Sequence, residues 1–306
     1  MRNAFVETIT HLAEKDPSIM LVIGDTGFGA FEGFEAKFSG RFVNVGIAEQ
    51  QFVSFAAGLA MSGMKVFAYN ICTFLIRAME QIRIEMSYQL APVVLVGVGG
   101  GFWYGTQGPT HHAVEDISQL RALPNLNIIC PGDPQQMKLA TEKAIYSGKP
   151  TYIRICRNND YILPVQLPNF TIGKAIKMRE GGDIALIATG GMLKEALSVA
   201  NILQEQGLSI CVLNMHTIKP IDKTAILDCA KHCRAVFTLE ENTILGGLGG
   251  AVAETLLQNN AIPMHFDMFG IPDTHARVSG TRDFLNEYYR LDVKSMVTRI
   301  TERLKS

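Results

Sequence analysis

The sequence predicts an α/β protein with two domains, each built on a parallel sheet. Short β-rich runs alternate with helical stretches along most of the chain, and this alternation is typical of parallel-sheet layers. The 306 residues are enough for two domains of ordinary size, each with its own core. Between the two halves, Pro164, Pro168, Gly173, Gly181 and Gly182 interrupt the pattern and indicate a linker or crossover.

The first domain is predicted at residues 1–165. Its expected strands are Met20 to Gly24, Arg41 to Val45, Lys65 to Tyr69, Pro92 to Val98, Asn127 to Cys130 and Thr151 to Ile155. Its expected helices are Asn3 to Lys15, Ile47 to Ser62, Thr73 to Leu90 and Pro134 to Ser147. A linker is predicted at 166–182, and the second domain at 183–306. The second pattern consists of strands Ile184 to Ala188, Ile210 to Asn214 and Ala235 to Glu240, and of helices Lys194 to Gln206 and Gly250 to Asn259.

Composition and charge argue against several classes of function. The net charge of −1, with both signs dispersed, argues against nucleic acid as the main partner. No apolar stretch reaches the ~18 residues of a membrane span, and the start of the chain lacks a signal-peptide pattern, so we expect a cytoplasmic protein. The six cysteines are scattered in apolar context, as reduced core thiols are. Cys229, His232 and Cys233 form one short cluster, which is a weak signal for zinc.

Glu49 is the first candidate for a functional residue. It lies between a short predicted strand and an apolar helix, with Val45, Phe52 and Val53 nearby in the sequence. A carboxylate in such surroundings is costly to ionise unless a ligand or neighbour pairs with it. A helix-start acid that only favours the helix dipole remains the alternative.

A second group of candidates lies in the segment from Gly105 to Asp116. It follows the predicted strand Pro92 to Val98 and a glycine-dense stretch, and it contains Thr110, His111 and His112. Open α/β sheets usually carry their chemistry on loops at the ends of buried strands.

Three motifs in order make the chain resemble the thiamine-diphosphate family that includes transketolase and deoxyxylulose-phosphate synthase. They are G-I-A-E-Q at Gly46–Gln50, T-F-L-x-R-A at Thr73–Ala78 and G-P-T-H at Gly108–His111. The segment from Ala235 to Gly250 is similar to the family's C-terminal domain, so the resemblance covers the whole chain. It implies a pyrimidine-binding domain followed by a transketolase C-terminal domain.

The metal-binding motif of the full-length family members is missing. They hold the diphosphate through Mg²⁺ with a G-D-G motif, and no Gly-Asp-Gly occurs in this sequence. Because orientation is a protein's main contribution to cofactor chemistry, we expect a separate N-terminal-half subunit that carries G-D-G, in an α2β2 heterotetramer. A fragment or a non-catalytic relative remains the alternative.

The resemblance also implies roles for individual residues. Glu49 matches the catalytic glutamate that hydrogen-bonds the aminopyrimidine ring, and Phe74 matches the aromatic residue that stacks on it, although Phe74 could simply belong to the core. Ile47 is expected beside the cofactor. His111 matches the catalytic histidine that hydrogen-bonds oxygens of the donor sugar, whereas His112 has no such match and is expected to pack or to face solvent.

The expected substrate-binding residues are His111, Gln107, Arg157, Arg2 and Arg77. Gln107 stands where family members usually carry an aspartate that binds a sugar hydroxyl, which leaves the acceptor preference open. The family's phosphate-binding basic residue of this loop falls on Gly99 or Gly100 here.

With that loop cation absent, Arg157 and Arg2 are the expected partners of an anionic group, because guanidinium pairs well with phosphate, sulfonate or carboxylate. Trp103 and Tyr104 could wall the channel or serve ordinary packing.

The function that we expect is therefore that of a split transketolase subunit. It would transfer a two-carbon ketol unit between sugars that are phosphorylated or otherwise anionic. The alternatives are a deoxyxylulose-phosphate-synthase-like enzyme, a 2-oxo-acid dehydrogenase β-type subunit and a non-catalytic regulatory subunit.

Overall fold

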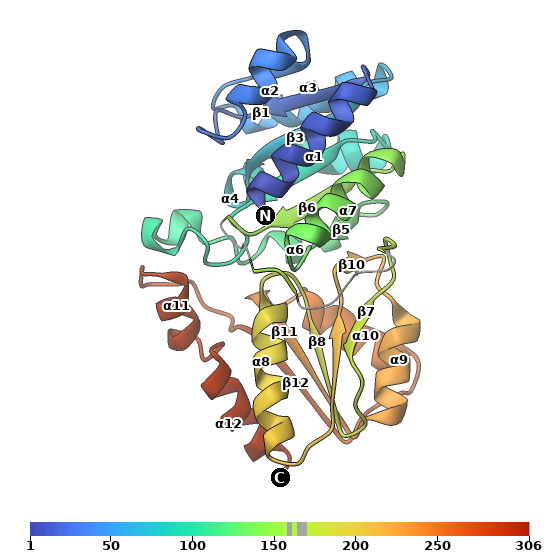
Figure 1. Cartoon of the computed structure of the whole chain (residues 1–306), viewed down its shortest axis with the longest axis vertical. Helices are drawn as coiled ribbons and strands as arrows, with labels where there is room; N and C mark the ends of the chain where they lie inside the picture. Colours follow the sequence, from blue (N-terminus) through green and yellow to red (C-terminus); the bar gives the residue numbers. More distant parts are fainter. Residues whose placement is uncertain (158–160, 164–169, 306) are drawn as a thin grey trace.

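The computed structural model describes residues 1–157, 161–163 and 170–305. The chain forms two α/β bodies stacked along the long axis of the molecule, with the N-terminus near their junction and the C-terminus at the far end (Figure 1). The expected fold class is confirmed, and each sheet is mostly parallel with one antiparallel strand at its edge. The division into domains at 1–165 and 183–306 stays a prediction, and its linker, 166–182, lies partly outside the described residues.

The first sheet has seven strands in the order β10-β5-β6-β4-β3-β1-β2. Its strands are β1 Ile19–Ile23, β2 Phe42–Asn44, β3 Lys65–Ile71, β4 Val94–Val98, β5 Asn127–Ile129, β6 Thr151–Ile155 and β10 Thr217–Lys219. Six of them are parallel, so their carboxyl ends meet at one edge of the sheet. β1, β4, β5 and β6 are fully buried, as expected where helices cover both faces.

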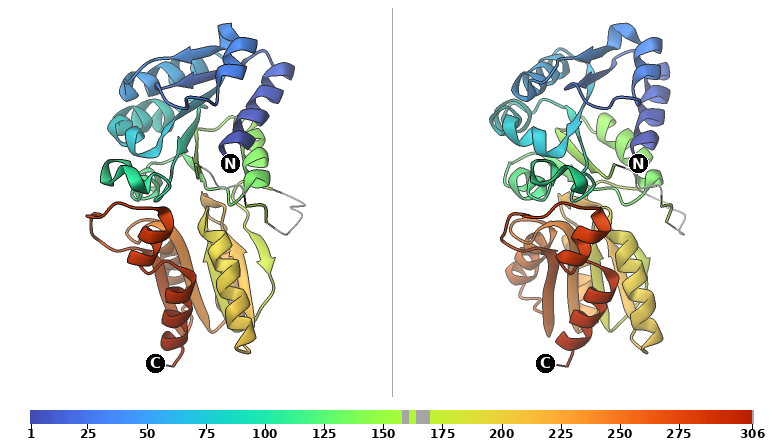
Figure 2. Two further views of the ribbon diagram at one scale, coloured as in Figure 1. Left: turned by 60° about the vertical axis from the view of Figure 1, so that its left-hand side comes forward. Right: turned by 90° about the vertical axis from the view of Figure 1, so that its left-hand side faces the viewer.

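Helices cover the two faces of the first sheet, which Figure 2 shows from the side. On one face, α1 (Arg2–Lys15) packs against α7 (Pro134–Tyr146) over a core that contains Phe5 and Met137. On the other face lies α3 (Glu49–Met61), with Phe52 and Val53 in the core. The shorter helices of this half are α2 Glu32–Lys37 and α6 Asp116–Arg121, with 3₁₀ turns at Ser39–Arg41, Gly105–Gln107 and Pro109–His111.

The prediction of one continuous helix from Thr73 to Leu90 is wrong. The segment consists of α4 (Cys72–Leu75), a 3₁₀ turn (Ile76–Ala78), α5 (Met79–Gln81) and a π-helical turn (Ile82–Tyr88). Cys72, Leu75, Ala78, Ile82 and Met86 are buried at intervals of three, three, four and four residues, so one face of the segment stays in the core through these changes of pitch. The core contacts of these side chains therefore favour changes in helical pitch that local propensity does not indicate.

The second sheet has five strands in the order β12-β11-β8-β9-β7. Its strands are β7 Ile176–Arg179, β8 Ile184–Ala188, β9 Ile210–Asn214, β11 Ala235–Thr243 and β12 His265–Ile271. Its helices are α8 Met192–Glu205, α9 Lys223–His232, α10 Leu248–Gln258, α11 Arg282–Tyr288 and α12 Val293–Arg303. The core on one face contains residues of α8, α11 and α12, and α9 and α10 contribute to the core on the other.

Three strands of the structure were not predicted, namely β7, β10 and β12, and one of them, β10, ties the two halves together. β7 lies within the segment expected as a linker and pairs antiparallel with β9. β10 leaves the second half of the chain and pairs antiparallel with β5 of the first sheet, where the His216 carbonyl also accepts a hydrogen bond of 2.7 Å from the Cys130 N–H. The two domains are thus joined by strand pairing.

Candidate active site

Four candidate segments follow parallel strands at the carboxyl edge of the first sheet, three of which, β6, β4 and β3, are direct neighbours. Glu49 follows β2, Phe74 follows β3, His111 lies in the loop after β4, and Arg157 follows β6. This edge is where open α/β sheets bind ligands. The topology therefore brings the main sequence-predicted residues to one side of the first domain.

Glu49 is the first residue of α3 and is buried, with 6% of its surface exposed. The loop before it is held by Asn44, whose Oδ1 accepts hydrogen bonds from the backbone N–H groups of Asp25 (3.0 Å) and Gly46 (2.9 Å). Gly46 has φ +77°, a conformation that glycine adopts readily. Next to the buried acid, Ile47 is 81% exposed. A buried carboxyl beside an exposed apolar side chain suits a site that a ligand covers.

Phe74, His111 and Tyr104 form an aromatic cluster. The ring centroids of Phe74 and His111 are 5.3 Å apart in an edge-on arrangement, and those of Tyr104 and His111 are 6.1 Å apart. The Thr110 hydroxyl and His111 Nδ1 share a hydrogen bond of 3.0 Å. Burial, and then the neighbouring His112, lower the pKa of His111 below its usual value. His111 is therefore neutral near pH 7 and can offer one donor and one acceptor nitrogen.

Arg157 extends this cluster, because its guanidinium carbon lies 4.8 Å from the centroid of the Tyr104 ring. Burial raises the pKa of Tyr104, and the positive charges of Arg157 and Arg2 oppose that rise. The same two arginines act on the pKa of buried Tyr69 at the end of β3, which burial raises. Among the described residues, the buried Nε of Arg2 has no hydrogen-bond partner. The guanidinium groups of Arg157 and Arg2 therefore both lie near Tyr69 and Tyr104, an arrangement that is suited to binding an anion.

Gly99 and Gly100, after β4, lie so close to neighbouring side chains that a larger residue would clash. A Cβ on Gly99 would lie 2.1 Å from the Tyr104 ring, and a Cβ on Gly100 would lie 2.6 Å from Arg154 Nε. Neither position has room for a basic side chain. Tyr104 instead occupies the space beside Gly99 and supports Arg157, a role that the sequence analysis left open.

The remaining candidates are not part of this cluster. Gln107 and Arg77 are exposed, and their predicted contacts with substrate stay predictions. His112 is buried, hydrogen-bonds the Gly105 carbonyl through Nε2 at 3.0 Å and packs edge-on against Phe102. Of the two alternatives for His112, packing is therefore correct.

A buried ion pair lies behind the cluster and was missed from the sequence. Arg154 on β6 donates through Nε to Asp116 at 2.9 Å, and Tyr152 donates to the same carboxylate at 2.7 Å. Arg154 also donates to the carbonyls of Ala113 and Glu241. An arginine inside an otherwise apolar strand is the local signal that could have revealed it, because charged residues are rarely buried unless paired.

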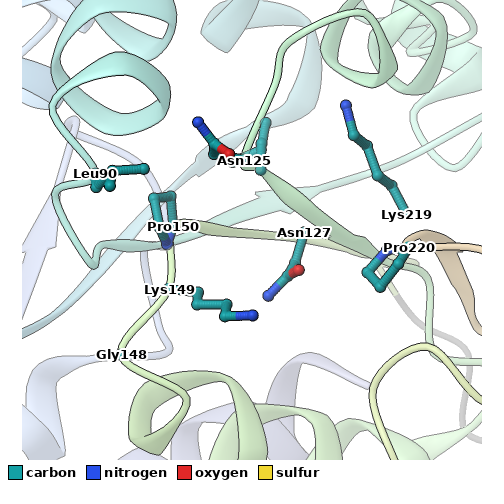
Figure 3. Close-up of a pocket in the computed structure, with 9 residues that line it drawn as sticks. Leu90, Asn125, Asn127, Gly148, Lys149, Pro150, Lys219 and Pro220 are labelled. Carbon is teal, nitrogen blue, oxygen red and sulfur yellow. The ribbon is translucent and has the colours of Figure 1, made fainter.

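A pocket of about 420 Å³ lies at the opposite edge of the first sheet (Figure 3). Asn127 and Pro150, which line it, stand at the amino ends of β5 and β6, away from the Glu49 edge. The Lys219 ammonium in its wall donates to the carbonyls of Arg121 and Leu123 behind helix α6. Lys219 thus stabilises a helix end, and the pocket does not contribute to the candidate active site.

Cys229 and His232 contact different groups. Cys229 Sγ lies 4.0 Å from Cys211 Sγ, while the exposed His232 ring hydrogen-bonds the Asp228 carbonyl. In the described part of the chain, no group of three or more His, Cys, Asp or Glu side chains is placed to hold a metal ion. Within the same residues, no helix has the length and apolar character needed to cross a bilayer.

Comparison with known proteins identifies the family to which the residues at this edge point. Residues 1–161 match the family described as "Transketolase, pyrimidine binding domain", and residues 173–296 match "Transketolase, C-terminal domain". The chain belongs to the transketolase family. The expected resemblance and the expectation of a transketolase-type enzyme are confirmed.

Transketolase subunits from bacteria are similar to the chain over nearly its whole length. An apulose-4-phosphate transketolase subunit of Phocaeicola vulgatus is 34% identical over 314 residues, which cover 99% of this chain and 97% of that protein. A 6-deoxy-6-sulfo-D-fructose transketolase subunit of Clostridium sp. is 34% identical over 308 residues, covering 99% and 95%.

A solved structure titled "Split gene transketolase, inactive beta4 tetramer" superimposes with a TM-score of 0.91 at 31% identity. It covers 99% of this chain, which in turn covers 98% of that one.

Proposed function

We propose that the chain is one subunit of a split, thiamine-diphosphate-dependent transketolase that transfers a two-carbon ketol unit from a ketose to an aldose. The observation that carries this proposal is the contact between Phe74 and His111, with rings 5.3 Å apart at the edge that also holds buried Glu49. It joins a cofactor-side residue and a substrate-side residue from two separate motifs. This arrangement favours a catalytic subunit over a non-catalytic one.

The residues at this edge fit the pyrimidine end of thiamine diphosphate. Glu49 would hold a ring nitrogen and share a proton with it, and burial suits such sharing because water does not compete for the carboxyl. Half-buried Phe74 offers an aromatic face, and exposed Ile47 offers apolar surface for a ligand to cover. When bound, the cofactor supplies the electron sink that stabilises the transferred ketol fragment.

The diphosphate end calls for a second subunit. The sequence contains no Gly-Asp-Gly motif, so we propose that an N-terminal-half transketolase chain holds the diphosphate and Mg²⁺, in an α2β2 heterotetramer. The relatives from P. vulgatus and Clostridium sp. are both named as subunits. A cytoplasmic location is part of the same proposal.

An anionic sugar is the proposed substrate class. His111, neutral near pH 7, can both donate to and accept from hydroxyl and carbonyl oxygens of a donor sugar. Arg157 and Arg2 would bind the anionic end through guanidinium hydrogen bonds. The two relatives are named for a sugar phosphate and a sulfo-sugar, and both of these carry an anionic group.

Reconstitution tests this proposal. The purified chain is mixed with a transketolase N-terminal-half subunit encoded in the same organism, thiamine diphosphate, Mg²⁺, a ketose phosphate and an aldose acceptor. We expect ketol transfer, measured by chromatography of the products, only when both chains are present. Transfer by this chain alone would refute the need for a partner, and no transfer by the stoichiometric pair over a panel of phosphorylated and sulfonated donors would refute the proposed function.

A further inference from the structure

The loop that carries His111 is anchored in the second domain. We call residues 101–113 the histidine loop. Its ends are joined by a backbone pair, in which the Gly101 N–H donates to the Ala113 carbonyl at 2.6 Å and the reverse bond measures 3.0 Å. Phe102 and Val114, at these ends, belong to the hydrophobic core of the second domain, where Phe102 stacks on Tyr289 at 5.4 Å. The base of the loop is thus buried in the other domain.

Glu241 on β11 holds the start of the histidine loop. Its Oε1 accepts a hydrogen bond of 3.0 Å from the Phe102 N–H, and its side chain is 3% exposed. A Cβ on Gly101 would lie 2.6 Å from Glu241 Cδ, and Gly101 has φ +76°. The backbone therefore approaches this carboxylate as closely as only glycine permits.

Arg282, at the start of α11, fixes Glu241 and the loop together. Its Nε lies 3.1 and 3.0 Å from the two Glu241 oxygens, and its Nη1 donates to Glu195 on α8 at 2.9 Å. Its guanidinium carbon lies 4.8 Å from the centroid of the Trp103 ring. One rigid, planar cation thereby joins β11, α8 and the histidine loop.

A further contact lies closer to His111. The Gly280 N–H donates to the Gly105 carbonyl at 3.2 Å, just before Arg282 in the sequence. A Cβ on Gly105 would lie 2.5 Å from the Gly280 carbonyl oxygen. In Figure 2 the segment before α11 runs directly beside the histidine loop in both views. The second domain therefore contacts the loop at its base and again within the turn that leads to His111.

From these contacts we propose that the second domain positions the substrate-binding histidine, with Arg282 and Glu241 as positioning residues. This inference rests on the proposed function. Arg282 and Glu241 hold the loop that presents His111 and Tyr104, while Glu49 and Phe74 lie on separate segments of the first domain. Loss of the Arg282 contacts should therefore impair use of the sugar and leave the affinity for thiamine diphosphate unchanged.

Four variants of this chain, each assembled with its partner subunit, test the proposal. Arg282→Met removes the cation and Arg282→Lys keeps it without the planar fork, whereas Glu241→Gln keeps an acceptor for the Phe102 N–H. Arg299→Met is the control outside the loop contacts. Arg299, on α12, also pairs with a carboxylate, that of Asp267 at 2.9 and 2.6 Å, and lies 4.9 Å from the centroid of the Phe269 ring, and its side chain is more exposed than that of Arg282 (48% against 16%).

The measurements are kcat, KM for the donor, the thiamine diphosphate concentration that gives half-maximal activity, and melting temperature. Misplacing His111 by about 1 Å should lower kcat/KM roughly hundredfold in Arg282→Met, with partial recovery in Arg282→Lys. We expect the cofactor requirement to stay at the wild-type value in every variant. If Arg282 had a purely structural role, Arg282→Met would have a lower melting temperature, but its kcat and KM would be unchanged at assay temperatures well below that melting temperature.

Trp103 supplies a readout that does not need activity. It is the only tryptophan of this chain, so the difference in emission between wild type and variant, each assembled with the same partner, reports on Trp103. We expect its fluorescence in Arg282→Met to shift to the red and to become more accessible to acrylamide, and to stay unchanged in Arg299→Met. If Arg282→Met does not fold, Arg282→Lys and Glu241→Gln decide the question.

Wild-type kcat/KM in the folded Arg282 variants, or an equal loss in Arg299→Met, would overturn the inference. If the wild-type pair shows no ketol transfer, the proposed function fails, and unchanged Trp103 quenching would separately refute the loop anchoring.

Discussion

Replacing Arg157 by alanine tests how the site binds its substrate. Arg157 is half-buried, with its guanidinium carbon 4.8 Å from the centroid of the Tyr104 ring, so its guanidinium is already oriented before substrate arrives. One hydrogen bond to a charged group contributes about 1.5–3 kcal/mol, which corresponds to roughly a ten- to hundredfold loss in kcat/KM. We expect Arg157→Ala to show this loss, mostly through KM, for a phosphorylated or sulfonated donor.

Comparison with an uncharged donor makes the test specific. For a neutral ketose such as a free pentulose, we expect kcat/KM to change by less than about threefold, because no charge-assisted bond is lost. Arg41→Ala is the control: Arg41 also stacks on an aromatic ring, 4.3 Å from Phe38, but precedes β2 at the opposite edge of the sheet. Equal losses for charged and neutral donors would show that Arg157 is structural and would refute the assignment.

Three further outcomes follow from the structure. Burial lowers the pKa of His216 to about 4, so the folded state binds a proton less readily than the unfolded chain. The free energy of unfolding should therefore fall by about 3 kcal/mol as the pH drops from 6.5 to 4. Urea titrations should show a flatter pH profile for His216→Phe than for the wild type. Asp116→Asn should cost about 3–5 kcal/mol of unfolding free energy, because Arg154 stays buried without its counter-charge, and a smaller loss would contradict that pairing. Calorimetry should show weak binding of thiamine diphosphate and Mg²⁺ to this chain alone, and tight binding would contradict the need for a partner.

Much of the fold was predictable because its parallel strands are short runs that are mostly apolar. The predicted strands Lys65 to Tyr69, Thr151 to Ile155 and Ile184 to Ala188 agree with β3, β6 and β8 to within two residues. β7, β10 and β12 were missed because they are edge strands whose pairing depends on partners in other parts of the chain. The pitch changes between Cys72 and Tyr88 were missed because core packing overrides local helix propensity there.

The candidate site was predictable only where function shows in a local motif. Glu49, Phe74 and His111 stand in three ordered motifs, so their convergence at one edge could be expected. The bond between the Phe102 N–H and Glu241 joins residues 139 positions apart, and no local pattern indicates such a pair.

The most direct test of the central claim is the activity of Glu49→Gln in the enzyme assembled from both subunits. Glutamine keeps the size of the side chain but cannot share a proton with the cofactor, so the account predicts that ketol transfer falls at least about hundredfold. It also predicts a melting temperature and subunit assembly like those of the wild type. A folded, assembled Glu49→Gln enzyme that transfers ketol units at the wild-type rate would contradict the account.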